Sequence, residues 1–154
     1  MAYGEVGCLL QYFQRQLLDN PSFFHAYQMD NEEQITNVFW ADARMIIDYE
    51  YFGDVVSLDT TYCTNRAHRP LALYFGFNHY RQIVVFGVAL MYDETVDSFK
   101  WLFETFLEAH GQKKPHTIFT DQDQAIARGL GEHHTFIWYI CKLMPKVTIL
   151  CYSL

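Results

Sequence analysis

Two aspartates follow short apolar segments that are typical of buried β-strands. Asp59 ends the segment 55–59, and Asp121 follows the segment 116–120. In sheets that alternate strands with helices, functional side chains gather where strands end. Two carboxylates brought together there can bind Mg²⁺, and a pair of such ions can activate water and stabilise the leaving oxygen during phosphodiester cleavage. Asp59 and Asp121 are therefore the candidate catalytic and metal-binding residues.

A structural interpretation of Asp121 stays open beside the catalytic one. The residues that follow it, 122–130, have the pattern of a short helix, and an aspartate before a helix often serves as its N-cap. Asp123 has the same ambiguity, and we interpret it as a solvated acid in the first turn.

Other combinations of metal-binding or nucleophilic residues have spacings that match no known site. The four cysteines lie far apart without a Cys-x-x-Cys pair, so reduced thiols are expected. We interpret the possible zinc ligands and the possible nucleophile pair as ordinary loop residues; these are His133, His134 and Cys141, and Cys63 with His68. The basic loop 65–69 is either a contact to DNA phosphate or a solvated turn.

The elements that must position the two aspartates follow from hydrophobic periodicity. Strands are predicted at 55–59, 71–78, 82–91 and 116–120, and helices at 95–110 and 122–130. Three hairpin-connected strands followed by a crossover helix and a fourth strand indicate a mixed α/β sheet flanked by helices, as in the RNase H-like fold. An N-terminal helix (6–18), a hairpin (23–29 and 34–40) and a helix (41–52), with Gly53 expected at its C′ position, lead into this core.

Composition narrows the class of protein. Among 154 residues, 51% are hydrophobic and 18% aromatic, which is enough to fill a core. The net charge of −7 argues against nonspecific binding of phosphate backbones by this chain. We find no apolar run that reaches the roughly 18 residues of a membrane span and no signal peptide, so we expect a soluble intracellular protein without a membrane partner.

Several segments, in the right order, resemble a known family. Residues 37–44, 49–56, 58–62 and 119–125 closely resemble the central domain of plant FAR-RED IMPAIRED RESPONSE-related proteins, which look like domesticated Mutator-like element (MULE) transposases. Residues 20–24 and 99–103 fit the same pattern, and the resemblance covers roughly residues 7–145.

The resemblance implies an RNase H-like transposase core within a nuclear regulator of transcription, of the type that acts in light signalling. Asp59 and Asp121 fall on the first two acidic positions of the transposase triad, which are ancestral Mg²⁺ ligands. Family members also contain a zinc-type DNA-binding domain and a SWIM zinc finger, so DNA and zinc are expected to bind through domains that this chain does not contain. Related family members are expected partners in homo- or hetero-oligomers.

The chain also departs from the family pattern. Phe136 and Tyr139 stand where the family has the Cys and His of a Cys-x-x-His element, and only Trp138 is kept. Neither replacement is a suitable ligand for zinc. The third acid, a Glu, has no counterpart before Leu154, so we expect a truncated, incomplete core. We divide the chain into leading elements (1–53), a partial MULE transposase domain (54–146) and an atypical C-terminal tail (147–154).

These observations favour a transposase-derived, non-catalytic regulator of transcription in the nucleus. No cofactor is expected in this chain. The alternatives are an incomplete Mg²⁺-dependent DNA transposase core that cuts phosphodiester bonds, and a decayed copy without function.

Overall fold

The computed structural model describes residues 5–61, 69–121 and 148–152. Within these ranges the chain forms the following elements: α1 (Glu5–Asp19), β1 (Phe24–Met29), β2 (Ile35–Ala41), α2 (Ala43–Phe52), β3 (Val55–Thr61), β4 (Leu71–Phe77), β5 (Ile83–Leu90), α3 (Val96–Ala109), β6 (Thr117–Asp121) and β7 (Thr148–Tyr152). None of the helices in this described part is both long and apolar enough to cross a membrane.

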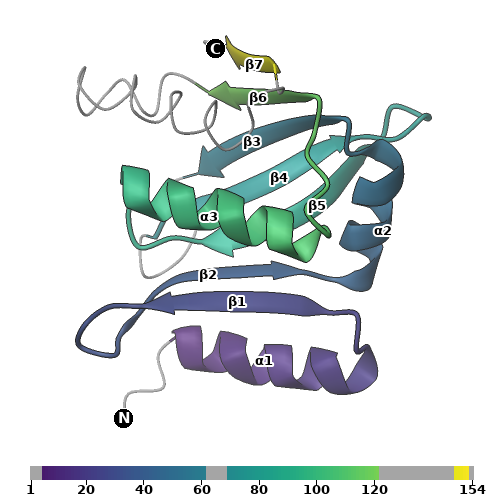
Figure 1. Ribbon diagram of the computed structural model, residues 1–154. Coiled ribbons are helices and arrows are strands. Elements are labelled where there is room, and N and C mark those ends of the chain that lie inside the picture. The colour runs from purple at the N-terminus through teal and green to yellow at the C-terminus, as the bar shows by residue number, and fades with distance from the viewer. Residues whose placement is uncertain (1–4, 62–68, 122–147, 153–154) are drawn as a thin grey trace.

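The strands form one mixed sheet in the order β1-β2-β5-β4-β3-β6-β7 (Figure 1). The neighbouring strands β1, β2, β5, β4 and β3 pair antiparallel to one another. Strand β6 pairs in parallel with both β3 and β7. Helix α3 connects β5 to β6 across the sheet, which is the crossover that a parallel partner for β3 requires.

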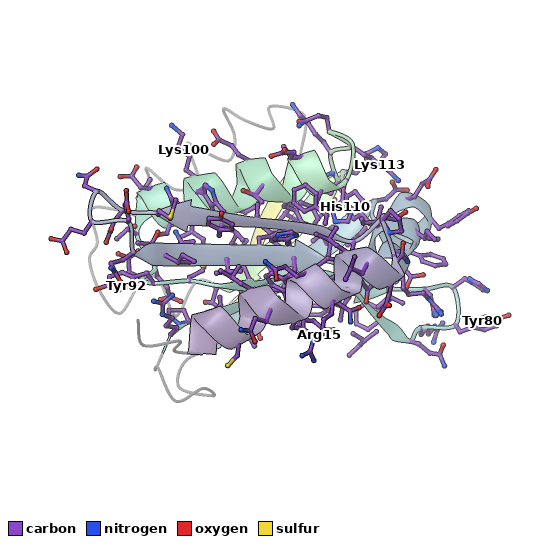
Figure 2. All side chains as sticks on the ribbon, turned by 90° about the horizontal axis from the view of Figure 1, so that it is seen from below. Arg15, Tyr80, Tyr92, Lys100, His110 and Lys113 are labelled. Carbon is purple, nitrogen blue, oxygen red and sulfur yellow. The ribbon has the colours of Figure 1, made fainter. Side chains whose placement is uncertain are left out.

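Helices cover the sheet on both faces. Successive residues of a strand point to opposite faces, and β2 shows which helix lies where. Phe39 and Ala41 are buried in the core formed with α2 and α3, whereas Val38, the residue before Phe39, is buried against Phe13 of α1. Figure 2 shows α1 and α3 on either side of the β1–β2 hairpin.

The main core forms around the apolar face of α3. The ring of Phe106 is 1% exposed and stacks on Tyr74 of β4 at 4.0 Å between centroids. Its edges meet Phe39 of β2 and Tyr49 of α2 in T-shaped contacts. Burying a side chain of this size contributes roughly 1.5–3 kcal/mol. One ring of α3 therefore joins three other elements.

Capping residues set the ends of the two helices on this face. Thr95 accepts a hydrogen bond from the backbone N–H of Ser98 at the start of α3, and Gly111 with φ +60° follows its end. Asp42 caps α2 by accepting from the N–H of Met45. Gly53 follows α2, but its φ is −79°, so it is not a left-handed C′ glycine. Glycine is needed there because a Cβ would collide with the Tyr49 ring.

The order of elements predicted from the sequence is confirmed over the described residues, with two differences. The strand predicted at 55–59 continues to Thr61, because the β-branched Thr60 and Thr61 pair with Ala72 and Leu71 of β4. The tail 147–154, which is unlike the family pattern, contributes strand β7 at the edge of the sheet beside β6. The predicted helix 122–130 lies outside the described residues.

His110 is a buried histidine at the end of α3. Its Nε2 lies 2.9 Å from the carbonyl oxygen of Phe86, which requires that Nε2 carry the proton and donate it. Its Nδ1 is buried without a hydrogen-bond partner among the described residues. Burial lowers the pKa of His110 to about 4, because a charged ring would lack both water and an acceptor at Nδ1.

The N-terminal hairpin is predicted to be part of the folding unit. Phe39→Ala removes a fully buried ring and should lower the free energy of unfolding by about 3–5 kcal/mol. Tyr27→Ala, in the same hairpin but at a residue that is 46% exposed, should cost less than about 1 kcal/mol. Urea unfolding followed by circular dichroism measures both. Equal, small effects would show that the hairpin folds independently of the core.

The stability of the chain is predicted to fall in mild acid through His110. Its folded pKa lies below the unfolded value of 6.5, so the unfolded state binds a proton first as pH falls. The free energy of unfolding should therefore drop by roughly 2 kcal/mol between pH 7 and pH 5 from this residue alone. His110→Gln should remove that part of the pH dependence, whereas His116→Gln, at an exposed histidine, should keep it. An unchanged pH dependence in His110→Gln would refute this assignment.

Candidate functional site

Asp59 lies within β3, not at its end as predicted. Val56, Leu58 and Thr60 are buried on the face that packs against α3. By alternation Asp59 is on the opposite face, where it is partly buried. It pairs with Leu73 of β4. The Asp59 side chain therefore projects from a strand whose backbone is hydrogen-bonded to β4 on one side and to β6 on the other.

Asp121 is the last residue of β6, the parallel neighbour of β3. The register pairs Leu58 with Thr120, so the next position along each strand is Asp59 on one and Asp121 on the other. Neighbouring strands lie about 4.8 Å apart. The backbone thus brings the two predicted residues side by side, as two adjacent parallel strands require. Asp121 also faces Tyr152 of β7 in the register.

Metal binding by this pair depends on which other potential ligands lie nearby. Within the described ranges, no group of three or more His, Cys, Asp or Glu residues is placed so that it could hold a metal ion. The transposase triad that the resemblance implies holds its two ions with a third acid beside these two carboxylates. The described residues therefore do not make up a two-ion site, and Asp59 and Asp121 as Mg²⁺ ligands stay a prediction. The same holds for Asp121 as a helix N-cap.

Most of the other candidates lie outside the described residues; these are Cys63, Asn65, Arg66, His68, Asp123, His133, His134 and Cys141. Arg69 is the exception. Its guanidinium donates hydrogen bonds to the backbone oxygens of Thr36 and Ile35, at 3.1 and 3.2 Å, and lies 5.6 Å from the centroid of the Tyr92 ring. Arg69 therefore ties the start of β4 to β2. It is neither a solvated turn residue nor a cation held ready for phosphate.

A buried polar cluster was missed by the sequence analysis. Asn37 of β2 is 1% exposed, and its side chain donates to Gln28 Oε1 (2.7 Å) and Ser98 Oγ (3.3 Å). Its Oδ1 accepts from the backbone N–H of Tyr92 at 2.9 Å. Asp93 completes the cluster, because its Oδ1 accepts from the Ser98 hydroxyl at 2.7 Å. The available signal was one asparagine in a strand that is otherwise mostly apolar.

This cluster is a structural site and not a catalytic one. It joins the hairpin strands β1 and β2 to the N-terminus of α3, and the buried amide has both its donor and its acceptor atoms satisfied. Two of the segments that carry the family resemblance are thus explained by folding. In 37–44, Asn37 links the hairpin to α3 and Asp42 caps α2. In 49–56, Gly53 packs against the ring of Tyr49.

Comparisons with known proteins give consistent results. The model of the MULE transposase domain matches residues 55–146. FAR-RED IMPAIRED RESPONSE 1 of Arabidopsis thaliana is 40% identical over 149 residues, which is 93% of this chain and 18% of that protein. FAR1-RELATED SEQUENCE 5 of the same plant is 41% identical over 145 residues, or 90% of this chain and 18% of that protein. No solved structure matches the chain.

The extent of these matches also limits what they say. FAR1-RELATED SEQUENCE 4 of Arabidopsis thaliana is 36% identical over 149 residues, which is 93% of this chain but 20% of that protein. The chain thus spans about a fifth of the length of the curated relatives it matches. From the matched segments and the family model, the chain belongs to the MULE transposase domain family and is similar to the FAR-RED IMPAIRED RESPONSE-related proteins.

Proposed function

We propose that this chain is a transposase-derived, non-catalytic part of a nuclear transcription regulator with an RNase H-like fold. The observation that carries the proposal is the 40% identity to FAR-RED IMPAIRED RESPONSE 1, whose name links it to the response to far-red light. In such a regulator DNA and zinc are bound by other domains, and this domain serves as a scaffold for contacts between proteins.

The sheet supports the RNase H-like part of the proposal. Strands β3, β4 and β5 form an antiparallel meander, α3 crosses over, and β6 returns in parallel beside β3. That order places the first and fourth core strands next to each other, so that the residues after Leu58 and Thr120 meet. The leading strands β1 and β2 extend the same sheet beyond β5, α2 packs in the main core, and α1 packs in a second cluster against the hairpin.

Three observations favour regulation over catalysis. Phe136 and Tyr139 stand where the family pattern has Cys and His, and neither is a suitable ligand for a borderline-soft metal such as zinc. The net charge of −7 disfavours binding to a phosphate backbone. Arg69, the one residue of the basic loop 65–69 that is described, is bonded to β2. The Asp59–Asp121 pair is then a record of ancestry.

An active, Mg²⁺-dependent transposase core is the second candidate, and the register of Asp59 beside Asp121 is the observation that favours it. A decayed copy without function is the remaining alternative. DNA nicking, a transcription reporter and the effect of Mg²⁺ on stability distinguish the regulator, the active transposase and the decayed copy.

The purified chain is predicted to leave DNA intact. A supercoiled plasmid that carries Mutator-type terminal inverted repeats should not be nicked in the presence of Mg²⁺ or Mn²⁺, because two carboxylates do not complete a two-ion site. Agarose gels measure the conversion of supercoiled to nicked circles. Nicking by the wild-type chain that disappears in Asp59→Ala would favour the active transposase.

A transcription reporter separates a regulator from a decayed copy. The chain fused to a heterologous DNA-binding domain should change transcription in plant nuclei, and the Asp59→Asn variant should change it equally.

Magnesium is predicted to have little effect on stability. A dissociation constant near 1 mM would add roughly 1.4 kcal/mol at about 10 mM Mg²⁺ and raise Tm by about 3–6 °C. We expect a smaller change than this, with no difference between the wild type and Asp59→Asn. A rise in Tm of the size given, lost in Asp59→Asn but kept in Asp97→Asn on the exposed face of α3, would mean that the metal site is still in use.

A further inference from the structure

A shallow groove separates α2 from the β4–β5 hairpin. Its volume is about 340 Å³, and its lining combines carboxylates, amides and apolar side chains; the lining residues are Asp42, Arg44, Met45, Asp48, Asn78, Gln82, Ile83, Val84 and Val85. Figure 1 shows the hairpin extending beyond the sheet next to α2. The groove lies away from Asp59 and Asp121, at the opposite end of β3.

A row of aromatic rings connects α2 to the tip of the β4–β5 hairpin. Tyr51 contacts Phe52 at 6.3 Å between centroids, Phe52 contacts His79 at 5.7 Å, and His79 contacts Tyr80 at 4.0 Å. The row therefore runs from α2 across to the tip of the hairpin. Its two outer rings are largely exposed, Tyr51 at 74% and Tyr80 at 72%.

The hairpin tip holds Tyr80 in this exposed position. The Asn78 side-chain oxygen accepts hydrogen bonds from the backbone N–H groups of Tyr80 (2.9 Å) and Gln82 (3.0 Å). Arg81 takes the left-handed conformation with φ +61° to close the turn. In Figure 2 the labelled Tyr80 projects away from the body of the protein. A turn whose backbone is fixed before binding loses little conformational entropy when it contacts a partner.

Aliphatic and aromatic side chains extend the exposed apolar surface along the sheet. Phe77 and Ile83 pair across β4 and β5, and they are 56% and 65% exposed. Val55, at the start of β3, is 48% exposed. Ile83 also lines the groove, so this exposed apolar row adjoins it, and exposed apolar patches are typical of surfaces that bind other proteins.

The charges of the groove indicate what the partner carries. Asp48 is 16% exposed, and its carboxylate has one ion pair, with Nε of Arg44 at 3.4 Å. The side chain of Arg44 is 83% exposed, and such an i,i+4 pair contributes little. Asp42 is a second carboxylate in the lining. With two acids against one base, the groove favours a cation.

We propose that this groove docks a segment of a partner protein in which an arginine or lysine stands next to an aromatic or large aliphatic side chain. The cation reaches Asp48 and Asp42, while the apolar side chain packs on the rings of Tyr51 and Tyr80. Arginine suits both contacts, because its guanidinium pairs with carboxylates and stacks on aromatic faces. A nucleic acid is the less favoured occupant, since its phosphates would meet the two carboxylates. The surface is independent of the ancestral metal positions.

Selection from a random peptide display library on the full 154-residue chain tests this directly. The selected peptides should be enriched in Arg or Lys next to an aromatic or large aliphatic residue. A synthetic peptide with the selected sequence is then the probe in calorimetry. Tyr80→Ala should weaken its binding at least about tenfold, as for the loss of an aromatic anchor. The matched control Leu18→Ala, at an 85% exposed residue of α1, should not.

The charge contact is tested by a double-mutant cycle. Asp48→Asn and replacement of the peptide's arginine by glutamine should each weaken binding, and the two losses should not add. Asp97→Asn is the matched acidic control, and circular dichroism melts check that each variant is folded. Acidic or featureless selected peptides, additive losses in the cycle, or binding unaffected by Tyr80→Ala would overturn the proposal. So would binding of a single-stranded oligonucleotide, but not of the peptide, at the groove.

Discussion

The packing of one ring, Phe106, holds the fold together. Phe106 on α3 meets Phe39 of β2, Tyr49 of α2 and Tyr74 of β4, so the helix that connects β5 to β6 is fixed over the middle of the sheet. That position lets β6 return in parallel beside β3. The adjacency of Asp59 and Asp121 is a consequence of this crossover. The same contacts explain why elements before residue 55, where the family model begins, belong to the core.

The order of the elements and the mixed α/β sheet could be predicted from the sequence because the elements have strong local signals. Periodic apolar residues and capping side chains such as Thr95 mark α3 whatever it packs against. The side-chain partners of Arg69 and Asn37 could not be predicted. Arg69 bonds to residues 33 and 34 positions away, and Asn37 bonds to residues 55 and 61 positions away. Such contacts depend on how the whole chain folds. A polar residue in an apolar strand shows only that some partner is needed.

The neighbouring positions of the two aspartates were predicted from the sequence, whereas the place of Asp59 within its strand was not. The adjacency of Asp59 and Asp121 followed from the expected strand order, and the register confirms it. Asp59 proved to lie within its strand because Thr60 and Thr61 continue the ladder with β4. A carboxylate held there is positioned by backbone pairing, which persists whether or not the chain still binds metal. The positions of Asp59 and Asp121 are therefore set by strand pairing, independently of the surface between α2 and the β4–β5 hairpin.

The parallel pairing of β3 with β6 is the central claim, because both the proposed RNase H-like core and the neighbouring positions of Asp59 and Asp121 depend on it. Nuclear Overhauser spectroscopy on the isotope-labelled chain measures it directly. We predict cross-peaks between the Hα and amide protons of residues 57–59 and 119–121, in the evenly spaced pattern of parallel strands. An antiparallel pattern of cross-peaks between β3 and β6 would contradict the account. So would cross-peaks from β3 to β4 without any from β3 to β6.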